Sequence, residues 1–223
     1  MKDIFKKFTY DLSKYNFRSY IEEVFQSSDL ENLHLIRPEL LPKKELKFEN
    51  ESQTDFHSIF YQKLNSPWTE FIETYKKFIK NEIATHFNEE IIFQSLPSFR
   101  AQIPNDQAVH KWHTDSDHDH NHPLGEINYC IAITDMIETS TIWIESEPQK
   151  KDFKPMNIKL GEYHRFNGNQ CLHGNKRNIT NKMRFSLDFR VLPRSKYSES
   201  EIKLSATAGR KFAVNHYYSE LKL

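Results

Sequence analysis

Residues 183–192 read Met-Arg-Phe-Ser-Leu-Asp-Phe-Arg-Val-Leu, and this stretch decides the fold class. Apolar and polar side chains alternate along it with the two-residue period of a β-strand. A strand at the surface of a sheet would give this pattern, but a row of charged groups also suits the wall of a cavity. The polar row consists of Arg184, Ser186, Asp188 and Arg190.

Similar short segments precede this one after about residue 90 and alternate with turn signals such as Pro104-Asn105-Asp106. This pattern predicts a sheet built from many short strands. We expect the strands at residues 91–103, 108–113, 127–134, 141–145, 156–160, 163–166 and 183–192.

The sequence before residue 90 has helical periodicity instead. An apolar stripe runs from Trp68 to Phe87, after a helix start at Ser66-Pro67. Helices followed by strands predict an α+β fold, a jelly-roll backed by N-terminal helices. We expect a single domain over residues 1–223, with helical support in 1–90, a jelly-roll core in 91–192 and a C-terminal extension in 193–223. In that extension, Tyr217 and Tyr218 either close the sheet or flank the pocket.

The composition excludes several classes of partner. Lys+Arg and Asp+Glu both number 31, so no net positive charge is available to hold nucleic acid or an anionic membrane. No segment has the roughly eighteen apolar residues of a membrane span, and no apolar secretory leader is visible. Two cysteines, Cys130 and Cys171, are too few for a disulfide framework. We expect a cytoplasmic protein that acts on a small molecule.

His113-Thr114-Asp115 is the strongest functional signal. A histidine and a carboxylate two residues apart project to the same side of an extended chain, so both can reach one metal. His173 offers a third ligand, which completes the two-histidine, one-carboxylate set of non-heme Fe(II) oxygenases. Arg184 follows His173 by eleven residues and could bind the carboxylate of a co-substrate. Together with this ligand set, the polar row of residues 184–190 is better read as facing a cavity.

A second set of metal-capable residues competes with the first. His120, His122 and Glu126 match the His-x-His-x-x-x-Glu spacing of cupins. Thr114 stands where that pattern has a glycine, and the run leads into the turn Pro123-Leu124-Gly125. We therefore interpret this segment as a solvated loop near the entrance, and keep a cupin-like module without oxygenase activity as the alternative.

The chain resembles Fe(II)/2-oxoglutarate-dependent oxygenases, in particular small bacterial enzymes grouped with streptomycin biosynthesis and with free-amino-acid hydroxylases and halogenases. The resemblance covers roughly residues 92–192. It is carried by Phe99-Arg100-Ala101-Gln102, His113-Thr114-Asp115-Ser116-Asp117, Gly125-Glu126-Ile127-Asn128, Trp143-Ile144-Glu145-Ser146, Arg165-Phe166-Asn167-Gly168-Asn169, Cys171-Leu172-His173-Gly174-Asn175-Lys176 and the stretch from Arg184 to Arg190.

This resemblance implies a double-stranded β-helix that uses Fe(II), with 2-oxoglutarate and O2 as co-substrates. By resemblance, His113, Asp115 and His173 hold the iron, and Arg184 with Ser186 binds the distal carboxylate of 2-oxoglutarate. Asn128 and Trp143 are further candidates for the 2-oxoglutarate pocket.

The resemblance also implies the kind of reaction. Halogenating relatives have a small residue where this chain has Asp115, so we expect hydroxylation instead. The candidate substrate-binding residues are His110, Glu145, Asp188 and Arg190. Charges of both signs would suit a free amino acid or another amine-bearing metabolite, unless Asp188 and Arg190 simply pair with each other. A peptide or a sugar substrate is the alternative.

Overall fold

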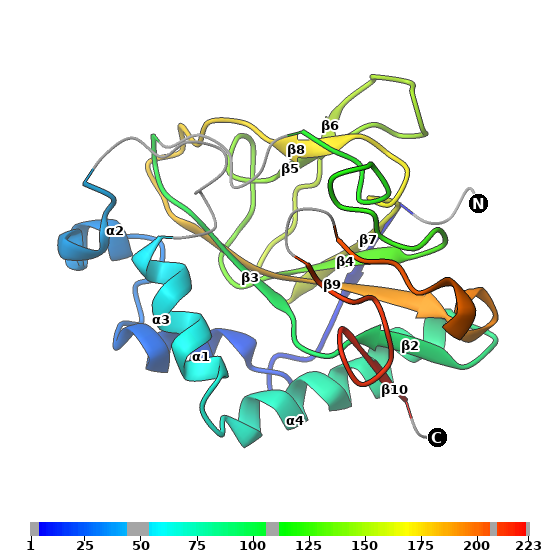
Figure 1. Cartoon of the computed structure of the whole chain (residues 1–223). Helices are drawn as coiled ribbons and strands as arrows, with labels where there is room; N and C mark the ends of the chain where they lie inside the picture. Colours follow the sequence, from blue (N-terminus) through cyan, green and yellow to red (C-terminus); the bar gives the residue numbers. More distant parts are fainter. Residues whose placement is uncertain (1–4, 44–53, 106–111, 206–208, 222–223) are drawn as a thin grey trace.

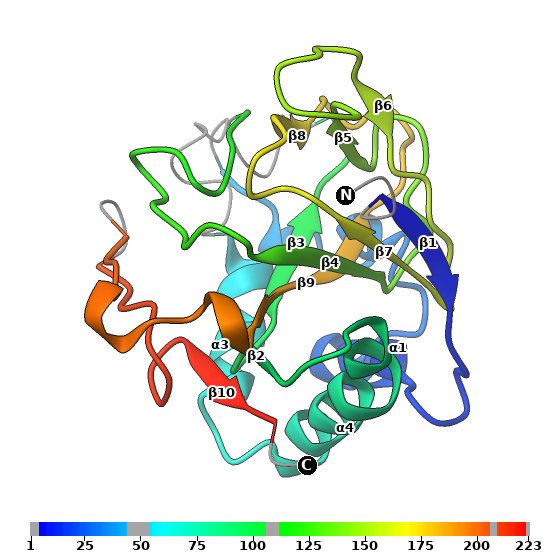
Figure 2. The ribbon, with the colours of Figure 1, turned by 90° about the vertical axis from the view of Figure 1, so that its right-hand side faces the viewer.

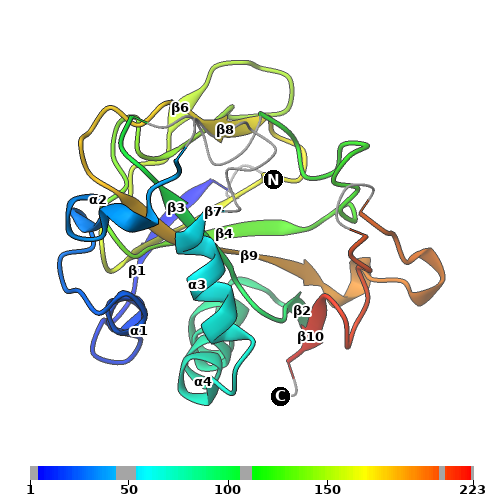
Figure 3. The ribbon, with the colours of Figure 1, turned by 60° about the vertical axis from the view of Figure 1, so that its left-hand side comes forward.

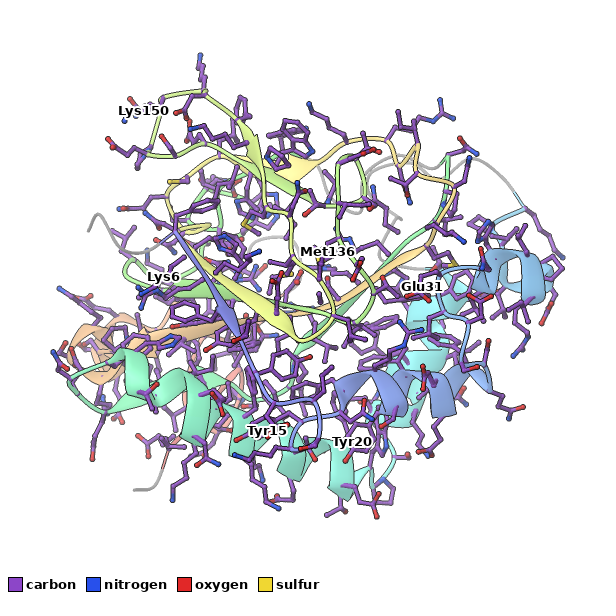
Figure 4. All side chains as sticks on the ribbon, turned by 180° about the vertical axis from the view of Figure 1, so that it is seen from behind. Lys6, Tyr15, Tyr20, Glu31, Met136 and Lys150 are labelled. Atoms are coloured by element: carbon purple, nitrogen blue, oxygen red, sulfur yellow. The ribbon has the colours of Figure 1, made fainter. Side chains whose placement is uncertain are left out.

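The computed structural model describes residues 5–43, 54–105, 112–205 and 209–221. Its elements form three layers, which Figures 1 and 3 show from two sides. Helices α1, α3 and α4 lie under one face of a large antiparallel sheet, and a small three-stranded sheet lies beyond the other face. Seen from behind in Figure 4, Tyr15 and Tyr20 lie in the helical layer, whereas Lys150 lies in a loop at the opposite end.

The helices are α1 (Phe17–Phe25), α2 (Leu33–Ile36), α3 (Asp55–Leu64) and α4 (Thr69–Phe78), with short helical turns at Pro38–Leu40, Ile79–Ile83, Ala84–His86, Arg194–Lys196 and Glu199–Glu201. The strands are β1 (Lys6–Thr9), β2 (Ile91–Gln94), β3 (Ser98–Gln102), β4 (Ile127–Ala132), β5 (Ile142–Ile144), β6 (Lys154–Pro155), β7 (Glu162–Phe166), β8 (His173–Asn175), β9 (Arg184–Pro193) and β10 (Tyr218–Glu220). None of the helices in the described ranges is long and apolar enough to cross a membrane.

Strand β9 is the centre of the large sheet. It pairs with β4 along one edge, and with β3 and then β2 along the other. The sheet continues through β7 to β1 on the β4 side, and to β10 on the β2 side. Figure 2 shows β1 and β10 on opposite sides of this sheet. The small sheet has the order β6-β5-β8.

The core between the large sheet and the helices is rich in aromatic rings. Phe99 of β3 stacks on Phe60 of α3 with ring centroids 4.3 Å apart, and on Phe185 of β9 at 5.6 Å. Phe71 and Phe78 of α4 are fully buried in the same cluster. The apolar row of β9 therefore faces the helices, so its polar row must face the small sheet.

Several expected boundaries were wrong. Residues 91–103 form two strands, β2 and β3, because the chain turns between them at Pro97. The expected strand at 156–160 holds only an isolated bridge between Ile158 and Met136. The expected helix begins at Thr69, after Pro67, and its end winds into π and 3-10 turns. Most of the expected strand 108–113 lies outside the described residues.

Both outer segments contribute a strand to the large sheet. Residues 1–90 were expected to be mainly helical, yet β1 joins the large sheet. In the C-terminal extension, Tyr218 begins β10 opposite Gln94 and so extends the sheet, while the adjacent Tyr217 reaches toward the polar face of β9. Tyr218 therefore extends the sheet, which is one of the two roles considered for this pair.

His57 connects α3 to the sheet and makes stability depend on pH. Its Nδ1 lies 2.8 Å from Thr54 Oγ1, and its Nε2 accepts a hydrogen bond from the Ala101 amide at 3.3 Å. Burial, with help from the charges of Arg100 and Arg184, lowers the pKa of His57 to about 3.

We therefore expect the free energy of unfolding to fall as the pH drops below about 6.5, because only the unfolded chain then protonates His57. The contribution of His57 to this loss should be about 2–3 kcal/mol between pH 7 and pH 4, and other buried histidines such as His164, whose pKa burial lowers to about 4, add to it. Urea unfolding at several pH values measures it. His57→Gln should make this dependence less steep, whereas the exposed His118→Gln should not. Parallel pH profiles for wild type and His57→Gln would contradict the prediction.

Candidate metal centre

A backbone bridge places two of the expected ligands side by side. The amide of His113 donates to the carbonyl of His173 at 3.0 Å, and the amide of His173 donates back at 3.0 Å. Gly174 allows this close approach, because a Cβ there would lie 2.8 Å from the Trp112 ring. The two imidazoles consequently lie with their centroids 4.5 Å apart.

Asp115 enters the same place from the following turn. Its amide donates to the carbonyl of Gly168 at 2.9 Å, and its carbonyl accepts from the His122 amide at 2.9 Å. Its Oδ1 lies 3.3 Å from His113 Nε2 and 3.9 Å from His173 Nε2. One ligand atom from each of His113, Asp115 and His173 lies within 4.8 Å of the other two. Among the described residues, this is the group of His, Cys, Asp and Glu side chains that could hold a metal ion.

The chemistry of these donors fits a divalent transition metal. Nδ1 of His173 lies 3.1 Å from the Cys171 carbonyl, which can only accept, so Nδ1 carries the proton and Nε2 keeps its lone pair. Burial, reinforced by His113, lowers the pKa of His173 to about 4. His173 is therefore neutral at pH 7, as a metal ligand must be.

Asp115 is fully buried and tightly held. Its Oδ2 accepts hydrogen bonds from Arg190 Nε at 2.7 Å and Asn128 Nδ2 at 2.6 Å, and its Oδ1 accepts one from Arg190 Nη2 at 3.0 Å. Burial alone would raise the pKa of Asp115, but the charge of Arg190 and a hydrogen bond from His113 hold it well below its usual range. The carboxylate is therefore ionised before any metal arrives.

His113 and His173 border a cavity of about 40 Å³ between the two sheets, and Asn128 and Arg190, which hold Asp115, border it too. The large sheet contributes Arg184 and Asp188, and the small sheet contributes Ile142 and His173. The polar row of β9 thus faces a cavity, as the sequence indicated. Arg184 is 1% exposed, and its Nη1 donates to Ser186 Oγ at 3.0 Å. The expected pair for 2-oxoglutarate therefore adjoins the expected metal ligands.

Asn128 lines this cavity, where it was expected to contact 2-oxoglutarate, but its amide group also contacts Asp115. Its amide nitrogen binds Asp115, so it supports a metal ligand directly. Its buried Oδ1 accepts no hydrogen bond from the described residues and lies on a residue that lines the cavity. A buried acceptor of this kind fits a cavity that receives a polar ligand.

Gly168 leaves the space that Asn128 occupies. A Cβ at this position would lie 2.9 Å from Asn128 Cγ and Nδ2 and from Phe166 Cε2. We expect Gly168→Ala to push Asn128 off Asp115 and to weaken Co(II) binding about tenfold, as loss of a ligand's supporting contact does. Equilibrium titration with Co(II) measures this. Gly209→Asn is the control, since that glycine is exposed at φ +61° and asparagine tolerates such backbone. Equal Co(II) affinities for both variants would contradict the prediction.

Two of the expected pocket residues lie elsewhere. Trp143 does not line the cavity, because Ile142 and Ile144 are the buried residues of β5 and alternation turns Trp143 away. Its indole donates to the Glu138 carbonyl at 3.0 Å. Glu145 does not line the cavity either, and it accepts hydrogen bonds from the amides of Leu172, Gln149 and Lys151. Burial opposes ionisation of Glu145, yet these amides lower its pKa.

The two charged residues Asp188 and Arg190 of β9 each form an ion pair within the protein. Asp188 and Arg190 do not pair with each other, since each binds another residue. Asp188 Oδ2 lies 3.1 Å from Arg100 Nε, and Arg190 binds Asp115. Both residues also line the cavity, so their expected contact with a substrate stays a prediction. The expected contact from His110 lies outside the described residues.

The histidine-rich segment is a loop, as expected, and His118 and Asp119 are solvated, but its later residues are not. His122 and Glu126 are buried, with His122 Nδ1 2.7 Å from Glu126 Oε2, and the Tyr218 hydroxyl binds Glu126 Oε1. His120 instead pairs with Asp117 at 2.7 Å and stacks on His113 with centroids 4.2 Å apart. His122 contacts Glu126, whereas His120 contacts Asp117 and His113. The two histidines therefore have different partners.

A larger cavity of about 480 Å³ lies between the end of α3, the β2–β3 turn and the C-terminal segment. Tyr61, Gln94 and Tyr217 contribute to its lining, and none of the three metal-ligand candidates does. Size alone would favour it as the binding site. The smaller cavity is the better candidate, because the ligand cluster and the buried Arg184 meet there.

No family model matches the sequence. The chain is 28% identical over 214 residues to the streptomycin biosynthesis protein StrG of Streptomyces griseus, covering 96% of this chain and 97% of StrG. This chain is similar to a streptomycin-biosynthesis protein. The similarity to streptomycin-biosynthesis proteins that the motifs predicted is confirmed.

Two similar solved structures come from the same genus. AviO1 of Streptomyces viridochromogenes has a TM-score of 0.46 and 11% identity, covering 88% of this chain and 92% of AviO1. HygX of Streptomyces hygroscopicus, with nickel, 2-oxoglutarate and hygromycin B bound, has a TM-score of 0.42 and 10% identity, covering 56% of this chain and 66% of HygX.

Proposed function

We propose that this protein is an Fe(II)/2-oxoglutarate-dependent dioxygenase that hydroxylates an unactivated C–H bond of a small polar metabolite. The observation that carries the proposal is the approach of His113 Nε2, Asp115 Oδ1 and His173 Nε2 to one point beside a buried arginine. Two imidazoles and one carboxylate on one side of a metal suit this class. In the proposed fold, the two facing sheets form a double-stranded β-helix around the site.

The residues of the chain divide the work. His113, Asp115 and His173 would hold Fe(II), and Arg184 with Ser186 would hold the distal carboxylate of 2-oxoglutarate by charge-assisted hydrogen bonds. When bound, Fe(II) and 2-oxoglutarate together supply the oxidising power with O2, and 2-oxoglutarate leaves as succinate and carbon dioxide. The apolar groups Ile142 and Phe166 border the same cavity and limit access of water.

The proposed substrate is an amine-bearing natural-product intermediate or a free amino acid. Similarity to StrG over nearly the whole chain supports the first. Asp188 and Arg190 are already paired with Arg100 and Asp115, so they offer a zwitterionic substrate no uncompensated pair of charges. Aminocyclitol-type sugars are therefore the first compounds to test, ahead of free amino acids.

A substrate panel tests the proposal. Enzyme, Fe(II), 2-oxoglutarate and each compound are incubated in chloride buffer. Succinate release above the substrate-free background is measured, and products are weighed by mass spectrometry. We expect a gain of 16 daltons in the product and no chlorination. Turnover without 2-oxoglutarate, or a chlorinated product, would contradict the proposal.

A further inference from the structure

The two oxygens of Asp115 have different surroundings. Oδ2 receives two hydrogen bonds, from Arg190 Nε at 2.7 Å and from Asn128 Nδ2 at 2.6 Å. Oδ1 faces the two Nε2 atoms of His113 and His173, at 3.3 and 3.9 Å, and receives one bond from Arg190 Nη2. Only Oδ1 therefore points at the place where the histidine donors converge.

A carboxylate can bind a metal with one oxygen or with both. If Asp115 used both, Oδ2 would turn away from Arg190 and Asn128. Because Asp115 is fully buried, water could not replace the lost contacts, and Arg190 would be left as a buried cation without its carboxylate. The surroundings of Oδ2 thus oppose two-oxygen binding.

Arg190 is itself fixed in place. It lies on the central strand β9, directly opposite Asn128 of β4, so both side chains reach Asp115 from the same face of the sheet. It is 8% exposed, and its Nη1 lies 3.5 Å from the hydroxyl of Tyr217, which donates to Gln94 Oε1 at 2.8 Å. Burial opposes its charge, but Asp115 raises the pKa of Arg190 well above its usual value. A fixed and permanent cation therefore holds Oδ2.

The contact between Arg190 and Asp115 affects how many coordination positions the metal keeps open. Two histidines and one carboxylate oxygen leave three of six positions open, and 2-oxoglutarate would fill two. A second oxygen from Asp115 would remove the position that O2 needs, or would compete with 2-oxoglutarate. We propose that Arg190 is a positioning residue that restricts Asp115 to one-oxygen coordination and so keeps these positions open. This inference rests on the proposed function.

Co(II) is a suitable probe, because its visible absorption reports coordination number without turnover. Wild type, Arg190→Met, Arg190→Lys and the control Arg194→Met are titrated first with Co(II) and then with 2-oxoglutarate. Arg194 carries the same side chain at the surface, 3.7 Å from Glu220. Circular dichroism and thermal unfolding identify the folded variants. Asn128→Ser, which frees the same oxygen less severely, is the second variant if Arg190→Met does not fold.

We expect folded Arg190→Met to retain Co(II) but to show a changed visible spectrum and about tenfold weaker binding of 2-oxoglutarate. Arg190→Lys should lie between this variant and wild type, since one ammonium cannot make both hydrogen bonds. Arg194→Met should match wild type.

A wild-type spectrum and wild-type 2-oxoglutarate affinity in folded Arg190→Met, or in Asn128→Ser where that variant is the one used, would overturn the inference. Complete loss of Co(II) from folded Arg190→Met would do so too, because Arg190 would then be needed for metal binding itself. Failure of wild type to bind Co(II) would overturn the proposed function together with this inference, whereas the first two outcomes leave the proposed function standing.

Discussion

Asp115→Ala is expected to abolish stoichiometric Fe(II) binding and to destabilise the fold at the same time. The metal loses one of three ligands, and Arg190, which now binds both carboxylate oxygens, becomes a buried cation without a partner. Removing one member of a buried ion pair costs about 3–5 kcal/mol. Equilibrium dialysis with metal analysis measures the first effect, and urea unfolding of the metal-free protein measures the second.

A double variant separates these two effects. Asp115→Ala with Arg190→Met removes both charges, so it should recover most of the lost stability but none of the metal binding. Full metal stoichiometry in Asp115→Ala would place the site elsewhere, with His120, His122 and Glu126 as the alternative. Equal stability of the two variants would show that the ion pair does not act as the structure implies.

Arg184→Ala is expected to raise the Michaelis constant for 2-oxoglutarate while leaving Fe(II) binding intact. Truncating one partner of a buried, hydrogen-bonded charge pair costs about 2–5 kcal/mol, which corresponds to a change of roughly 30-fold to several thousand-fold. Steady-state succinate release at varied 2-oxoglutarate measures it. Arg184→Lys should recover part of the loss, because a point charge cannot form the two parallel bonds of a guanidinium.

The neighbouring arginines provide the comparison for this experiment. Arg100 and Arg190 border the same cavity, but each already binds a carboxylate, Asp188 and Asp115 respectively. Arg100→Ala should therefore change the Michaelis constant for 2-oxoglutarate less than Arg184→Ala does. The reverse order of effects would assign the co-substrate carboxylate to Arg100.

Local sequence patterns predicted much of the centre. The alternation in β9 identified a polar row, and its occurrence together with the three ligand candidates indicated that this row faces a cavity. The same rule applied to β5 would have excluded Trp143, because Ile142 and Ile144 claim the inward positions. The pocket role of Trp143 was implied by the resemblance alone, and the burial pattern of β5 does not support it.

The missed features depend on contacts between distant segments. Arg190 meets Asn128 only through the register of β4 and β9, and Tyr218 meets Glu126 across 92 positions of sequence. Nothing in the local pattern around His122 distinguishes a buried His–Glu pair from a solvated loop. Very short edge strands such as β1 likewise depend on the partner strand, since four residues carry little periodicity of their own.

A change from aspartate to glycine requires a single base in any aspartate codon, so the evolutionary distance to a different use of this centre is small. At residue 115 it would leave a hole beside the metal, lined by the guanidinium of Arg190 and the amide nitrogen of Asn128. Those donors suit a halide ion, which would also neutralise the stranded arginine. The contact that holds the carboxylate in this protein would thus offer a receptor for chloride in a descendant that regained metal binding through further changes.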